Sequence, residues 1–156
     1  MEKHKHLSNL FFIFFPMFLC IVIDVGAAGG CFWSNGYFIN VVNDIYHGHN
    51  KVMVHCKSKD NEIGVKTIGF NQSVEWKFCE KIWTPSTLFF CHFYMGNVEQ
   101  VFDVYNNGIG PQCVERKKEE YWRCTWLIKT DGFYFVDRTS GVRKDVKKYD
   151  WKAITS

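Results

Sequence analysis

The stretch KVMVHCKSKDNEIGVK, residues 51–66, raises the question on which both the fold and the function depend. In its first seven residues Val52, Val54 and Cys56 fall on one face of an extended chain, and mainly polar residues fall on the other. This period of two predicts a half-buried β-strand, and the charged, glycine-containing segment after it predicts a turn. His55 beside Cys56 admits three interpretations: a nucleophile with its base, a metal ligand, or one half of a disulfide.

The same alternation of apolar and polar residues recurs along the chain, whereas helical periodicity is almost absent. Turn residues such as Gly96-Asn97 separate the alternating segments, and Asp131-Gly132 predicts a two-residue hairpin turn. The predicted strands are 37–45, 51–57, 73–80, 88–94, 98–105 and 121–129, with a further strand after the hairpin turn. Many short strands at this spacing predict an all-β sandwich or barrel.

The N-terminal 28 residues have the composition of a secretory signal peptide. Lys3 and Lys5 form a basic head, residues 10–23 are almost wholly apolar, and small residues follow. The apolar run is shorter than the roughly 20 residues that span a bilayer, which favours a signal peptide over an anchor. We expect cleavage near Ala27 or Ala28, and a secreted, extracellular protein without a membrane span. Residues 29–156 are then a single domain.

Six cysteines remain once Cys20 leaves with the predicted signal peptide: Cys31, Cys56, Cys79, Cys91, Cys113 and Cys124. An even number in an oxidising compartment predicts three disulfides. None has the spacing of a zinc site, so we expect no metal ion. Adjacent strand residues point to opposite faces, so His55 is badly placed to act as a base for Cys56. A core-facing disulfide cysteine is therefore the favoured interpretation.

Two further cysteines have a predicted direction. Cys124 falls on a core face beside Trp122 and Trp126, as expected for a bridge between two sheets. Cys79 falls on the outward face of its strand, which suits a link to a peripheral segment. Cys31 is the natural partner in such a segment.

Charge and motif content argue against two function classes. The chain has 19 Lys and Arg against 16 Asp and Glu, a net charge of +3, and its clearest basic cluster is residues 143–152. This mild excess is not a nucleic-acid signature; we expect a solvated basic tail, with contact to acidic cell-surface polymers or lipids as the alternative. The acidic residues fall in turns, on outward faces or in the run 115–120, without a carboxylate pair or an activated nucleophile. We expect no enzyme and no cofactor.

An ordered set of short motifs resembles the plant self-incompatibility protein family, the S-protein homologues, over nearly all of residues 29–156. The motifs are Asn43-Asp44, His55-Cys56-x-Ser58-x-Asp60 ending at Gly64, Trp76-x-Phe78, Phe90-Cys91, Phe102-Asp103, and Cys124-x-Trp126 before Asp131-Gly132. The resemblance implies a small, disulfide-stapled β-sandwich of antiparallel strands that is secreted.

The best understood members of that family are pistil ligands that a pollen membrane receptor recognises, which leads to calcium entry and arrest of self pollen. The resemblance therefore implies an extracellular signalling ligand for a plasma-membrane receptor on a neighbouring cell. A secreted carbohydrate-binding or defence protein of the cell wall is the alternative that the residues leave open. We expect a monomer.

The chain departs from the family pattern in its cysteines. Cys113 lies farther from Cys124 than is usual, and Cys31 and Cys79 are additional to the usual four. With Cys31 paired to Cys79, we expect Cys56 and Cys91 to pair with Cys124 and Cys113 in some order.

Recognition by a receptor would use exposed loops whose side chains the core does not need. Two segments meet this description: residues 59–62, and the glycine-rich residues 106–112, a mobile segment anchored at one end by Cys113. The candidate receptor-binding residues are Lys59, Asp60, Asn61, Glu62, Asn106, Asn107 and Gln112. Asn71-Gln72-Ser73 is a glycosylation sequon in a predicted loop, so we expect Asn71 to carry a glycan.

Overall fold

The computed structural model describes residues 31, 33–46, 48, 51–80, 83, 87–115 and 121–155; the predicted signal peptide lies outside them. Its elements are β1 (Gly36–Asn43), β2 (Val52–Lys57), β3 (Glu62–Ile68), β4 (Ser73–Cys79), β5 (Phe89–Met95), β6 (Val98–Tyr105), the short 3-10 helix η1 (Gly110–Gln112), β7 (Val114–Glu115), β8 (Tyr121–Lys129), β9 (Gly132–Asp137), β10 (Lys144–Tyr149) and β11 (Lys152–Ala153). The predicted all-β class is confirmed.

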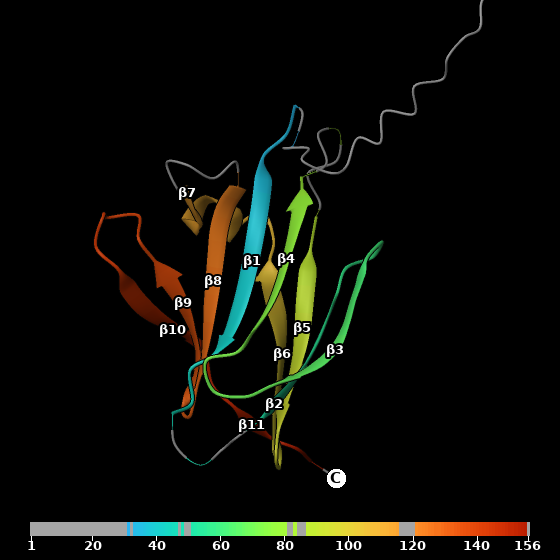
Figure 1. Ribbon diagram of the computed structural model, residues 1–156, viewed down its shortest axis with the longest axis vertical. Coiled ribbons are helices and arrows are strands. Elements are labelled where there is room, and N and C mark those ends of the chain that lie inside the picture. The colour runs from blue at the N-terminus through green and yellow to red at the C-terminus, as the bar shows by residue number, and fades with distance from the viewer. Residues whose placement is uncertain are drawn as a thin grey trace, which may run out of the picture.

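The strands form two sheets that pack face to face as a sandwich (Figure 1). The first, sheet A, has the order β10-β9-β8-β1-β4, with β7 pairing beside β8; the second, sheet B, has the order β11-β6-β5-β2-β3. All pairs are antiparallel except β1 with β8. This parallel pair is possible because most of sheet B lies between β1 and β8 in the chain, and a parallel pair needs a long crossover.

The predicted strand faces agree with the observed burial. Val52, Val54 and Cys56 are fully buried, and the residues between them are exposed or half-buried. Trp126 of β8 is 2% exposed and lies at the centre of the core, where its Nε1–H donates a hydrogen bond of 2.9 Å to the Val104 carbonyl across the sandwich. Burial of the apolar faces of both sheets supplies the main stabilisation of the fold.

Two segments form strands that the sequence did not predict. Residues 62–68 form the edge strand β3 rather than a turn, and the basic cluster 143–152 forms β10 and β11 rather than a tail. These edge strands bury few of their side chains, so their sequences lack the alternation that reveals a half-buried strand, unlike that of β4, which is also an edge strand. Charged side chains, lysine above all, prevent an edge strand from pairing with another chain. Lys147 of β10 is one of them, and its Nζ lies 3.1 Å from Asp131 Oδ2 and 2.8 Å from Asp150 Oδ1.

The predicted turn at Gly96-Asn97 and the predicted hairpin after β8 are both present, the second with a shift in register. Gly96-Asn97 joins β5 to β6, as predicted. Lys129 pairs with Gly132, so the second turn consists of residues 130–131, and Gly132 is the first residue of β9. Gly132 has φ 145°, and a Cβ at this position would collide with the Tyr149 carbonyl oxygen. The glycine is therefore required by close approach of the next strand, not only by the turn.

The disulfides confirm one predicted pair and correct the others. Cys31 is bonded to Cys79, whose side chain lies on the outward face of β4, as predicted. Cys56 is bonded to Cys91, so the prediction that each would pair with Cys124 or Cys113 is wrong. The two cysteines lie directly opposite each other on β2 and β5, with Cα atoms 4.1 Å apart. The sequence indicated that Cys56 faces the core but not which strand is its neighbour.

The third disulfide joins Cys113 to Cys124, and both residues are buried. The prediction that Cys124 bridges the two sheets is therefore also wrong. Cys113 directly precedes β7, which pairs with β8 in the same sheet as Cys124. The bond fixes the point at which the chain, coming from β6 of sheet B, enters sheet A.

Candidate functional site

The two predicted recognition segments leave the sandwich at the same end (Figure 1). Lys57 at the end of β2 pairs with Phe90 of β5, and the adjacent Phe89 pairs with Tyr105 at the end of β6. The segments that follow β2 and β6 are thus separated by the width of one intervening strand, or about 10 Å. The fold brings together two loops that are far apart in the sequence.

Ser58 holds the turn between β2 and β3. Its Oγ accepts hydrogen bonds from the backbone N–H groups of Asp60 and Asn61 at 3.3 and 3.0 Å, and the Ser58 N–H donates to the Asn61 carbonyl at 2.8 Å. A serine that bonds the backbone two or three residues ahead stabilises a tight turn. Ser58 supplies these bonds, and Lys59, which is not needed for them, is exposed.

Glu62 follows the turn as the first residue of β3 and is itself held in position. Its Oε1 lies 2.8 Å from His55 Nε2 and accepts a 3.1 Å hydrogen bond from the Gly64 N–H. Because an ionised carboxylate only accepts, the imidazole Nε2–H is the donor. The His55 hydrogen bond lowers the pKa of Glu62 below its usual value. Glu62 therefore presents a fixed negative charge beside the turn.

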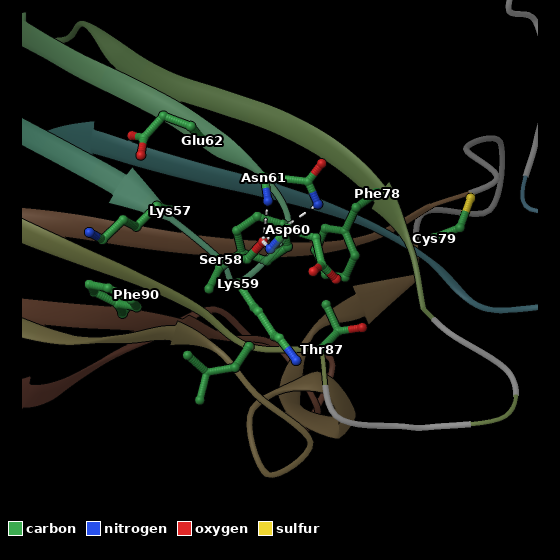
Figure 2. Close-up of a pocket in the computed structure, with 12 residues that line it drawn as sticks. Lys57, Ser58, Lys59, Asp60, Asn61, Glu62, Phe78, Cys79, Thr87 and Phe90 are labelled. Carbon is green, nitrogen blue, oxygen red and sulfur yellow. Dashed lines mark hydrogen bonds between the residues drawn. The ribbon is translucent and has the colours of Figure 1, made fainter.

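A pocket of about 960 Å³ lies between this turn and the facing ends of β4 and β5 (Figure 2). The turn supplies its charged wall, and Phe78 of β4 with Phe89 and Phe90 of β5 supply aromatic surface. The Phe78 and Phe89 ring centroids are 4.8 Å apart, and Lys57 Nζ lies 5.5 Å from the centroid of Phe90. The pocket thus combines a packed aromatic surface with both signs of charge.

The opposite wall of the pocket contains Thr87 and Cys79. The Thr87 Oγ1 atom is buried and has no hydrogen-bond partner among the described residues. In the view of Figure 2, Lys59 extends from the turn toward Thr87. Cys79 is tied to Cys31, which fixes the end of β4 that forms this wall. This wall therefore contains a buried hydroxyl whose hydrogen-bonding capacity is unused by the described residues.

The second predicted segment, residues 106–112, is closed by its own hydrogen bonds. Asn106 Oδ1 accepts from the N–H groups of Gly108 and Ile109 at 2.9 and 3.1 Å, and Gln112 Nε2–H donates to the Gly108 carbonyl at 2.7 Å. These bonds tie polar side chains to the backbone of the segment, so Cys113 is not its only point of attachment. Of the predicted residues here, Asn107 is exposed, whereas Asn106 and Gln112 maintain the turn.

Neither predicted segment brings together the groups of a metal site. Within residues 31–155, leaving aside the undescribed positions, no group of three or more His, Cys, Asp or Glu is placed to hold a metal ion. Over the same part of the chain, no helix is long and apolar enough to cross a membrane. A preformed, partly charged pocket with aromatic walls is suited to binding a side chain of another molecule.

Comparison with known proteins gives the class to which this sandwich belongs. A family model described as plant self-incompatibility protein S1 matches residues 38–151. The chain is 31% identical to S-protein homolog 5 of Arabidopsis thaliana over 105 residues, which are 67% of this chain and 71% of that protein. It is 28% identical to S-protein homolog 21 of the same plant over 130 residues, 83% of this chain and 90% of that protein. The chain therefore belongs to the plant self-incompatibility protein S1 family, as the sequence motifs predicted.

Several residues of the pocket were not anticipated from the sequence. Phe78 and Phe90 were recognised in two of the family motifs but not as residues of a site, and Thr87 was not singled out. No local pattern indicates them, because the pocket exists only where β4 and β5 lie opposite the β2–β3 turn. The serine after His55-Cys56-Lys57 was a usable signal, since serine favours turns that begin at its own position.

Asn71 has the exposure that glycosylation requires. It lies in the turn before β4, its side chain is exposed, and its φ of 59° is a left-handed conformation that asparagine tolerates. We expect plant-made protein to lose mass when treated with a glycan-removing enzyme, and protein carrying Asn71→Gln to show no such loss. If the protein with Asn71 intact keeps its mass after this treatment, the prediction is contradicted.

Proposed function

We propose that the protein is a secreted signalling ligand that a plasma-membrane receptor on a neighbouring cell recognises through the β2–β3 turn and the pocket beside it. The predicted signal peptide and the three disulfides support secretion, because such bonds persist in oxidising compartments. Membership of the self-incompatibility family supports a role outside the cell.

One observation carries this proposal: the charged turn is rigid and exposed, and its side chains are not used by the core. Ser58 and the His55–Glu62 contact fix the turn, which leaves Lys59 outside the internal packing. A binding surface that is already ordered loses little conformational entropy when a partner docks. Loops presented by a rigid sandwich are a common place for recognition.

A calcium measurement tests the proposal. Folded protein added to responsive plant cells that carry a cytosolic calcium reporter should give a rapid, saturable calcium rise. Brief protease treatment of the cell surface should abolish it, because the receptor is a membrane protein. Reduced and alkylated protein is the matched control and should be inactive. Saturable binding to isolated wall polysaccharide with no calcium rise in any pollen, pistil or leaf cell type would instead favour the wall-binding alternative.

A further inference from the structure

A second depression lies away from the turn, on the outer face of sheet A. Its volume is about 330 Å³, within the range of about 300–1,000 Å³ typical of small-ligand sites. Val42 of β1, Leu127 of β8 and Val136 of β9 line it; Leu127 and Val136 are only 6% and 7% exposed and form its floor. Its lining residues are all different from those of the pocket beside the turn.

Three arginines line this groove, Arg123 of β8 and both Arg138 and Arg143 of the β9–β10 connection, and Asp44 is the one carboxylate among its described lining residues. Arg123 of β8 lies over the Phe38 ring, with its guanidinium carbon 4.3 Å from the ring centroid. Arg143 is held by Asp145, with Nε–H donating to Oδ1 at 2.9 Å. These contacts fix two of the guanidinium groups before any ligand arrives.

Arg138 is different, because it makes no ion pair with any residue in the described part of the chain. It is exposed and follows the last residue of β9. A guanidinium group binds carboxylates and phosphates through two parallel hydrogen bonds. Arg143 is already paired with Asp145, so the positive charge that the groove offers to a ligand comes mainly from Arg138, whose hydrogen-bonding capacity is unused by the described residues.

The polar groups between the arginines restrict the kind of anion. Asn40 of β1 and Thr125 of β8 pair in the sheet and both line the groove. The Asn40 Oδ1 atom is buried and accepts no hydrogen bond from the described residues. A sulfate dianion has no hydrogen to donate to it, whereas a ligand with hydroxyl groups both donates and accepts.

We propose that this groove binds a sugar acid, as one carboxylate-bearing unit of an acidic extracellular polysaccharide. The carboxylate pairs with Arg138, a ring hydroxyl donates to Asn40, and the C–H face of the sugar lies on the aliphatic floor. Binding at this face leaves the β2–β3 turn accessible. The same molecule can therefore be retained by an acidic polymer while its turn remains available to a receptor.

Calorimetric titration with a galacturonate tetramer tests this site. The protein is used as plant cells make it, with its three disulfides formed; because Asn71 lines the groove, a second sample with any glycan on Asn71 removed is titrated in parallel. We expect saturable binding that is lost when the carboxyls of the tetramer are methyl-esterified. Arg138→Gln should weaken binding by about tenfold, the effect of losing a hydrogen-bonded charge pair. Lys152→Gln, which removes the same charge from β11 in the other sheet, should change it by less than about twofold.

Three results would overturn the proposal. The first is no saturable binding of the tetramer. The second is equal weakening by Arg138→Gln and Lys152→Gln, which would show attraction to net charge only. The third is displacement of the tetramer by inorganic phosphate as effectively as by galacturonate, which would show an anion site without sugar recognition. Replacing charges in the β2–β3 turn should leave this affinity unchanged, so failure here is distinguishable from failure of the proposed receptor site.

Discussion

Removing the Cys56–Cys91 disulfide by changing both cysteines to alanine should lower the free energy of unfolding by about 2–5 kcal/mol. Both residues are fully buried, so the double variant also loses core contacts. The bond spans 35 positions of the chain and joins neighbouring strands at the centre of sheet B. Its loss therefore releases a long loop in the unfolded state and weakens packing in the folded state.

His55→Ala is the matched control, because His55 is adjacent to Cys56 on the same strand and its side chain points outward. It loses one contact with Glu62 at a site where the two side chains are 35% and 59% exposed. Such exposed pairs contribute about 0–1 kcal/mol. Urea unfolding followed by tryptophan fluorescence measures both variants. Equal destabilisation of the two would contradict the assignment of strand faces.

Removing the two charges at the tip of the β2–β3 turn should shift the receptor response to a much higher protein concentration. Lys59→Gln with Asp60→Asn leaves Ser58, Asn61 and Glu62 in place, so the hydrogen bonds that hold the turn through the Ser58 hydroxyl are retained. Charged residues at the centre of an interface commonly contribute 2 kcal/mol or more, so we expect a loss of affinity of about thirtyfold.

Asp150→Asn with Lys152→Gln is the control for this variant. It also removes one charge of each sign, but near β11, which pairs with the start of β6 at the other end of the sandwich. This control should retain the full response. Both double variants should keep the circular dichroism of a β-sheet protein and three disulfides, so that any difference between them reports recognition rather than folding.

The interior strands could be predicted from the sequence because each has one face in the core. Val52, Val54 and Cys56 show this, since their alternation is a direct consequence of burial on one side. The edge strands β3 and β10 lack that signal: β3 buries only Ile68, and β10 consists mainly of exposed lysines and their neighbours. The parallel pairing of β1 with β8 was also unpredictable, because strand periodicity contains no information about neighbours.

The same limit explains which parts of the sites were found. The β2–β3 turn was predicted from its own residues, and the charged residues at its tip, Lys59 and Asp60, are exposed in the structure. The aromatic wall from Phe78 and Phe90 and the arginine groove are assembled from strands distant in the sequence. Cys56 and Cys91 illustrate the point for disulfides, because only the register of β2 with β5 reveals that they are opposite each other.

The central claim is that the ordered β2–β3 turn is the part of the molecule that a receptor binds. The most direct measurement is the calcium rise in responsive plant cells as a function of the concentration of the Lys59→Gln/Asp60→Asn variant. We predict that its dose–response curve shifts by about thirtyfold to higher concentration, while the Asp150→Asn/Lys152→Gln control coincides with the unaltered protein. An unshifted curve from the correctly folded turn variant would contradict the claim.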